Sequence, residues 1–166
     1  MSAPIVERDF QRGKVYQAEQ FARTLFARAG QHPGRSMDFF GSTLTLPPAA
    51  KFSGVPEVQR YVERVLAMPA VRERWPAARP VSVRAHRGAQ SAFYRNGTIA
   101  VPGSRSGAWF FGGELPCLHE LAHHLAPEGA AHGPQYVETF RALVAMVMGP
   151  EAGHVIHVLY AHHGVR

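Results

Sequence analysis

The chain has 166 residues, of which 46% are hydrophobic, so it is long enough and apolar enough to bury a core as one globular domain. Its 18 basic and 12 acidic residues give a formal charge of +6, and its single cysteine, Cys117, excludes an internal disulfide framework. No stretch approaches the roughly 18 apolar residues of a membrane span, and the N-terminus lacks the apolar core of a signal peptide. A cytoplasmic protein without a membrane partner is therefore expected.

Helical and strand patterns alternate in the first half of the chain. Gly30 ends the first helical pattern, His32 in the following turn is expected to be solvated, and Pro47-Pro48 ends the first strand pattern. Periodicity predicts four elements in this half: a helix over 15–29, a strand over 37–46, a helix over 56–68 and a short helical turn over 70–75.

A hairpin is expected in the middle of the chain. Residues 81–87 alternate apolar and polar side chains as in a half-buried strand, with His86 on the polar side. The strand-like segments 91–94 and 98–101 flank Asn96-Gly97, which is a strong signal of a two-residue hairpin turn. A Gly/Ser-rich loop follows, and its Trp109-Phe110-Phe111 either line a substrate pocket or pack under the next helix.

The segment His119-Glu120-Leu121-Ala122-His123 is an H-E-x-x-H motif. On a helix, residues four apart lie about 40° apart around the axis, so His119 and His123 leave the same face and can bind one Zn²⁺. Glu120 lies about 100° from His119, which suits it better to accept a proton from a metal-bound water than to act as a third ligand. The motif predicts a catalytic zinc site.

A catalytic zinc usually has three protein ligands, and His132 is the preferred third. Residues 126–129 break the helix and let the chain turn back, while Pro134 suits the first turn of a new helix over 134–148. The gap from His123 to His132 is longer than in metzincins. Glu138, on the new helix, is the rival third ligand.

Other polar residues near the motif have alternative interpretations. Cys117 is expected to be a buried small hydrophobe, and His124 to support the site or lie at the surface. Tyr136 either donates a hydrogen bond to a developing oxyanion or packs in the core. A last helix is predicted over 152–161, and four more histidines lie on it or after it: His154, His157, His162 and His163. Surface or helix-end positions are favoured for them over a second metal site.

The motif and the His132-Gly133-Pro134 segment resemble those of zincin-like metallohydrolases, including SprT-like and WLM-type metalloproteases. The whole chain resembles a small family of actinobacterial H-E-x-x-H metallohydrolases. The segments that carry this resemblance include Arg8-Asp9-Phe10-Gln11-Arg12, Lys14-Val15-Tyr16, Phe39-Phe40-Gly41-Ser42 and Leu44-Thr45-Leu46-Pro47-Pro48. It implies a zinc hydrolase, with residues 98–101 as the edge strand of a substrate cleft.

These patterns together predict a single α+β, zincin-like domain over residues 1–166, with about five helices around a small antiparallel or mixed sheet. His119, His123 and His132 are expected to bind Zn²⁺, and Glu120 to act as general base in the hydrolysis of a peptide or protein substrate. The charge of +6 motivates one alternative, a nuclease or a DNA-associated protease, although the arginines are scattered along the sequence. A non-catalytic protein with structural zinc is another.

Overall fold

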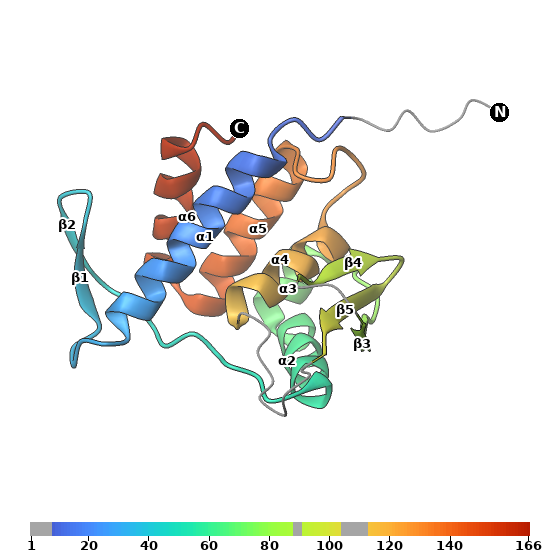
Figure 1. Ribbon diagram of the computed structural model, residues 1–166. Coiled ribbons are helices and arrows are strands. Elements are labelled where there is room, and N and C mark those ends of the chain that lie inside the picture. Colours follow the sequence, from blue (N-terminus) through green and yellow to red (C-terminus); the bar gives the residue numbers. More distant parts are fainter. Residues whose placement is uncertain (1–7, 88–90, 104–112) are drawn as a thin grey trace. The chain divides into compact units, whose positions relative to one another are not determined.

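A computed structural model describes residues 8–87, 91–103 and 113–166 (Figure 1). These residues form six helices and two small sheets, which confirms the predicted α+β class. The backbone contacts divide the chain into two compact units, one made of residues 1–47 with 126–166 and one made of residues 48–125. In the described part of the chain, no helix combines the length and the apolar character needed to cross a bilayer.

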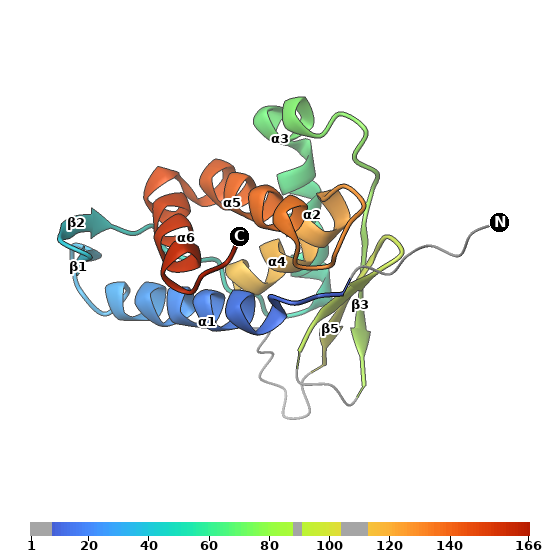
Figure 2. The same ribbon diagram turned by 90° about the horizontal axis from the view of Figure 1, so that it is seen from above.

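The first unit is built on three helices, α1 (Arg12–Ala29), α5 (Pro134–Met148) and α6 (Pro150–His162), which lie side by side in Figures 1 and 2. Gly149 joins α5 to α6 with a φ of 99°, a backbone angle that glycine adopts without strain. The two helices then pack closely, since a Cβ on Gly153 would lie 2.7 Å from the Cβ of Ala145. All three helices were predicted, although α1 begins at Arg12 instead of residue 15 and α6 spans Pro150–His162 instead of residues 152–161.

The same unit contains a hairpin where one continuous strand was predicted over 37–46. Strands β1 (Ser36–Phe39) and β2 (Ser42–Thr45) pair antiparallel, with Phe39 opposite Ser42. The turn residues Phe40 and Gly41 have φ values of 46° and 82°, which is the left-handed conformation of a tight two-residue hairpin turn. Phenylalanine rarely adopts that conformation, so the turn was missed.

The second unit contains a three-stranded sheet and its helices. Its strands are β3 (Ser82–His86), β4 (Phe93–Arg95) and β5 (Thr98–Pro102), in the order β3-β5-β4. The β4–β5 pair is the predicted hairpin, and its turn residues Asn96 and Gly97 both have positive φ. The helices of this unit are α2 (Val55–Ala67), α3 (Pro69–Arg74) and α4 (Glu114–Leu125).

Strand β5 occupies the centre of this sheet, so the expectation that residues 98–101 form its edge was wrong. β5 pairs in parallel with β3 on one side and antiparallel with β4 on the other. The outer side of β3 is bonded by Gln59 of α2, which accepts from the Val83 amide at 2.7 Å and donates to the Val81 carbonyl at 3.0 Å. The strand next to α4 is β4, which becomes the candidate edge.

Candidate metal centre

Helix α4 carries the H-E-x-x-H motif, and a buried carboxylate at its first residue fixes where it begins. Glu114 accepts hydrogen bonds from the Ala50 amide at 2.8 Å and from the Tyr61 hydroxyl at 2.5 Å. Burial, reinforced by the negative charge of Glu114, raises the pKa of Tyr61, so its hydroxyl stays protonated and remains a donor. An acidic residue in the first turn also suits the positive end of the helix dipole.

His119 and His123 leave the same face of α4, as their spacing predicts. Their Nε2 atoms lie 3.2 Å apart. Two nitrogens bound tetrahedrally to zinc at roughly 2.0–2.1 Å would be about 3.3 Å apart, so the pair already has the separation of one edge of a zinc site. His119 is buried and His123 is half-buried. The two imidazoles are therefore pre-arranged to share one ion.

Two residues close to His119 in the sequence, Cys117 and Glu120, are also buried. Glu120 is buried on α4. Cys117 is fully buried, and burial raises the pKa of its thiol, so the residue stays a neutral thiol. Its predicted role as a small buried hydrophobe is confirmed, and the role of Glu120 as general base stays a prediction.

His132 lies in the turn before α5 and is held by three residues of the N-terminal segment. Its Nδ1 lies 2.6 Å from a carboxylate oxygen of Asp9, and its carbonyl accepts a hydrogen bond from Gln11 at 2.7 Å. The ring of Tyr16 packs edge-on against the imidazole, with 5.3 Å between centroids. A proton on Nδ1 that is donated to Asp9 places the lone pair of a neutral imidazole on Nε2, the atom that would coordinate a metal.

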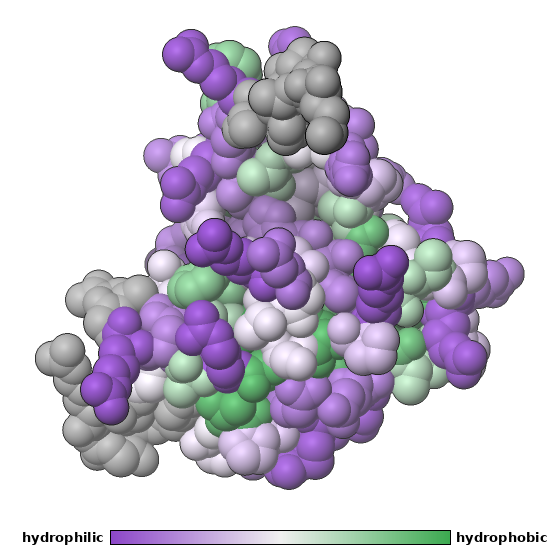
Figure 3. Space-filling model, turned by 90° about the vertical axis from the view of Figure 1, so that its right-hand side faces the viewer, coloured by the Kyte–Doolittle hydropathy of each residue, from purple (hydrophilic) through white to green (hydrophobic). Residues whose placement is uncertain are grey.

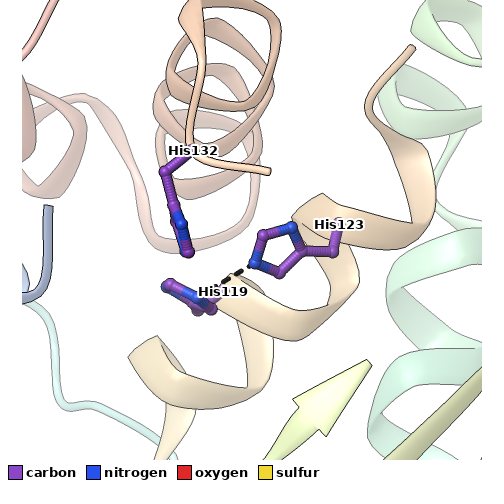
Figure 4. A group of neighbouring side chains, drawn as sticks. All are labelled: His119, His123 and His132. Carbon is purple, nitrogen blue, oxygen red and sulfur yellow. Dashed lines mark hydrogen bonds between the residues drawn. The ribbon is translucent and has the colours of Figure 1, made fainter. Parts of the chain in front are cut away.

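One nitrogen from each of His119, His123 and His132 lies within 4.8 Å of the other two, so the three residues could hold a metal ion. Figure 4 shows the three rings converging, two from one helix and one from the turn before the next. Among the described residues, this is the one group of histidine, cysteine and carboxylate side chains with such spacing. The rival ligand Glu138 is not part of it, because its side chain is 59% exposed and pairs with Arg141.

Tyr136 has the packing role, and the alternative of an oxyanion donor loses support. Its side chain is buried, and its hydroxyl donates to Glu19 of α1 at 3.1 Å. Tyr160 of α6 donates to the same carboxylate oxygen at 2.5 Å, and burial together with Glu19 raises its pKa. Glu19 thus links α1, α5 and α6 through two tyrosine hydroxyls, while the ring of Tyr136 packs against His132 with 5.0 Å between centroids.

The other histidines do not join the group. His124 lies between the Tyr94 hydroxyl, 3.0 Å from its Nδ1, and the Arg79 carbonyl, 2.7 Å from its Nε2, so it ties α4 to β4 and to the segment before β3. His32, His154, His157 and His162 are exposed, and His163 bonds the Leu159 carbonyl at the end of α6. The predicted Trp109-Phe110-Phe111 loop lies outside the described residues.

Sequence reasoning missed the residues that support the third histidine. Asp9 and Gln11 precede His132 by more than 120 residues, and Glu19 is a lone acid in a helical pattern. No spacing rule connects such distant positions. The only signal was the inclusion of Asp9 and Gln11 among the segments that carry the family resemblance.

Comparison with known proteins adds no family assignment: no protein-family model, curated protein or solved structure matches this chain.

Proposed function

We propose that this protein is a metal-dependent hydrolase, and specifically a zinc metallopeptidase. The observation that carries the proposal is the convergence of His119 and His123 of an H-E-x-x-H helix with His132. This ligand set, with a carboxylate next to the first histidine, is the arrangement that amide hydrolysis at zinc uses.

The residues present fit a zinc ion. Imidazole is a preferred ligand of Zn²⁺, and the 3.2 Å separation of the His119 and His123 nitrogens matches a tetrahedral edge. Asp9 supplies the carboxylate that metal-binding histidines commonly bond through their other nitrogen. The group contains three ligands within the described residues, which favours a catalytic site with one open position over a four-ligand structural site.

The proposed mechanism assigns one role to each residue. A bound zinc ion supplies a Lewis acid that polarises a carbonyl and makes water nucleophilic near neutral pH. Glu120 accepts the proton of the attacking water and returns it to the leaving amine. Asp9 keeps the proton of His132 on Nδ1, and the Gln11 amide holds the backbone of His132 in place.

An extended peptide would bind along β4 rather than along β5. β5 is paired on both sides and the outer side of β3 is bonded by Gln59, whereas β4 lies next to the motif helix α4. The Tyr94–His124 hydrogen bond fixes β4 to α4, so main-chain groups of β4 are held at a constant position relative to His119 and His123. Strand addition would use those groups to orient the substrate.

Metal content tests the proposal first. Elemental analysis would compare wild type with His132→Ala, Glu138→Ala, Glu120→Gln and, as a matched control, the exposed histidine variant His157→Ala, all purified without chelator. We expect one zinc per chain in wild type and in the last three variants, and a loss in His132→Ala. Wild type without metal, even after zinc is supplied, would refute the proposal.

Hydrolysis is tested next with a library of quenched fluorescent peptides. Glu120→Gln should keep its zinc and lose about 10²–10⁴-fold in turnover, since that is the usual contribution of a general base. A variant that keeps full activity would exclude Glu120 as the base. Cleavage of nucleic acid instead of peptides by the zinc-loaded protein would favour the nuclease alternative.

A further inference from the structure

The positive charge of this protein is concentrated in one part of its sequence. Residues 74–113 hold six of the 18 basic residues, all of them arginine, and none of the 12 acidic residues. That stretch therefore carries the whole formal charge of +6, and the rest of the chain is balanced. It also contains all three strands of the sheet β3-β5-β4. The excess of basic over acidic residues thus belongs to one sheet and its connections.

The register of the sheet brings its charged residues to one face. Arg84 of β3 is paired with Ala100 of β5, and Ala100 with Phe93 of β4. Residues directly opposite on paired strands point to the same side of a sheet, and so do residues two apart along one strand. Arg84, Phe93 and Arg95 therefore share a face. Tyr94 points to the opposite face, where its hydroxyl bonds His124 of α4.

Phe93 of the outer strand β4 is the exposed aromatic residue of this face. Its side chain is 39% exposed although it is a large apolar ring. The Arg84 guanidinium lies 5.9 Å from its ring centroid, and the His86 ring lies 5.1 Å away. Arg84 and Arg95 are both exposed, whereas Ala100, which is paired with both Arg84 and Phe93, is fully buried. The result is a surface on which one exposed aromatic ring lies beside the Arg84 guanidinium, with Arg95 on the same face.

The helices of this unit leave that face open. In Figure 2, α2 and α4 lie on one side of β3 and β5, and no helix drawn for the unit lies on the other. Figure 3 views the molecule from that other side, where hydrophilic side chains cover most of the surface around a limited hydrophobic band. A sheet face of this kind is not the face that packs into the core of the unit.

We propose that this face, defined by Arg84, His86, Phe93 and Arg95, binds single-stranded nucleic acid. Guanidinium groups bond phosphate oxygens, and an exposed aromatic ring on a sheet stacks with an unpaired base. Residues 74–113 themselves contribute no carboxylate that would repel a polyanion. A sheet face with a stacking ring suits unstacked bases better than a duplex, whose grooves admit a helix or an extended arm. The proposal does not depend on the metal centre.

The test is fluorescence anisotropy of a labelled 15-nucleotide oligothymidylate with the full chain, at NaCl concentrations from 50 to 200 mM. The double variant Arg84→Gln/Arg95→Gln should bind more weakly, and its slope of log affinity against log salt should be shallower by about 1.4, or about 0.7 for each phosphate that is no longer neutralised. Phe93→Ala should weaken binding by about 5- to 150-fold at an unchanged slope, because stacking releases no counterion.

Matched controls separate this face from general basicity. Arg28→Gln/Arg60→Gln removes the same charge from exposed positions on α1 and α2, and Phe40→Ala removes another exposed ring; both should bind like wild type. Phe93→Leu keeps apolar bulk without the ring and should also lose affinity, while Phe93→Tyr should retain it. No binding at 50 mM NaCl, equal losses in the controls, or equal affinity for a duplex or for phosphatidylserine vesicles would overturn the proposal.

Discussion

The carboxylate of Asp9 should determine how tightly the protein holds its metal. Asp9→Asn and Asp9→Ala both remove the charge that lies 2.6 Å from Nδ1 of His132. Without it, the Nδ1 proton is no longer fixed, and the imidazole loses basicity at Nε2. Loss of such a supporting carboxylate typically weakens metal affinity by about 10- to 100-fold, or about 1.4–2.7 kcal/mol.

The structure indicates why the loss should be partial. His119 and His123 keep their 3.2 Å separation on α4, and the Gln11 bond still holds the backbone of His132. Asp9→Asn should fall near the lower end of the range, because an amide oxygen can still accept the Nδ1 proton. His132→Ala, which removes a whole ligand, should be weaker than either Asp9 variant.

Competition with a chromophoric chelator for Zn²⁺ and Co²⁺, at one fixed pH, measures these affinities directly, since metal binding by imidazole depends on pH. Asp38→Asn is the matched control, because Asp38 is an acidic residue on β1 that bonds Thr43. Thermal unfolding in chelator shows whether each metal-free variant is folded. Wild-type metal affinity in Asp9→Ala, together with a loss of affinity in His132→Ala, would show that the Asp9 carboxylate does not support metal binding.

Three further outcomes concern stability. Gly153→Ala should destabilise the fold by about 1–3 kcal/mol, because the new Cβ would meet the Cβ of Ala145 at 2.7 Å and its Cα at 3.1 Å. Gly13→Ala has no atom within 4 Å of the new Cβ and should stabilise the fold by about 0.4–1 kcal/mol. Urea unfolding measures both changes, and similar effects of the same sign would contradict the close α5–α6 packing. Tyr61→Phe should cost about 1–3 kcal/mol in the same assay by removing a buried donor to Glu114, and a neutral result would mean that water replaces it. The pKa values of Tyr61 and Tyr160 are raised in the folded state, so these groups should not change the free energy of unfolding below about pH 10. Above about pH 10, the free energy of unfolding should fall by about 1.4 kcal/mol per pH unit for each tyrosine. A pH series of unfolding free energies should show a shallower alkaline slope in Tyr61→Phe/Tyr160→Phe than in wild type.

Local patterns predicted much of this fold. The α5 helix has the predicted bounds of 134 and 148, because Pro134 begins it and Gly149 ends it within the sequence itself. The β4–β5 hairpin was recognisable for the same reason, since Asn96-Gly97 is a local turn signal. The Phe40-Gly41 turn was missed because only one of its two residues favours a positive φ.

Pairing between distant segments could not be predicted in the same way. The central position of β5 results from a parallel pairing with β3 and an antiparallel one with β4, and periodicity describes each strand without naming its neighbour. The metal site likewise contains residues that local patterns predict and residues that they do not. His119 and His123 follow from a four-residue spacing, and His132 from its residue type after a helix break. Asp9, 123 residues away from His132, follows from tertiary structure alone.

The first unit combines residues from both ends of the chain, so it cannot be completed until synthesis of the chain is nearly finished. Helix α1 is synthesised early, but its packing partner α6 and the tyrosines that bond Glu19 come from the last third of the chain. Gln11 likewise bonds the backbone of both His132 and Arg166. Until those residues leave the ribosome, α1 lacks its native contacts with α6, and His132 cannot be positioned. We expect a nascent chain stopped before residue 126 to expose α1 to chaperones and proteases.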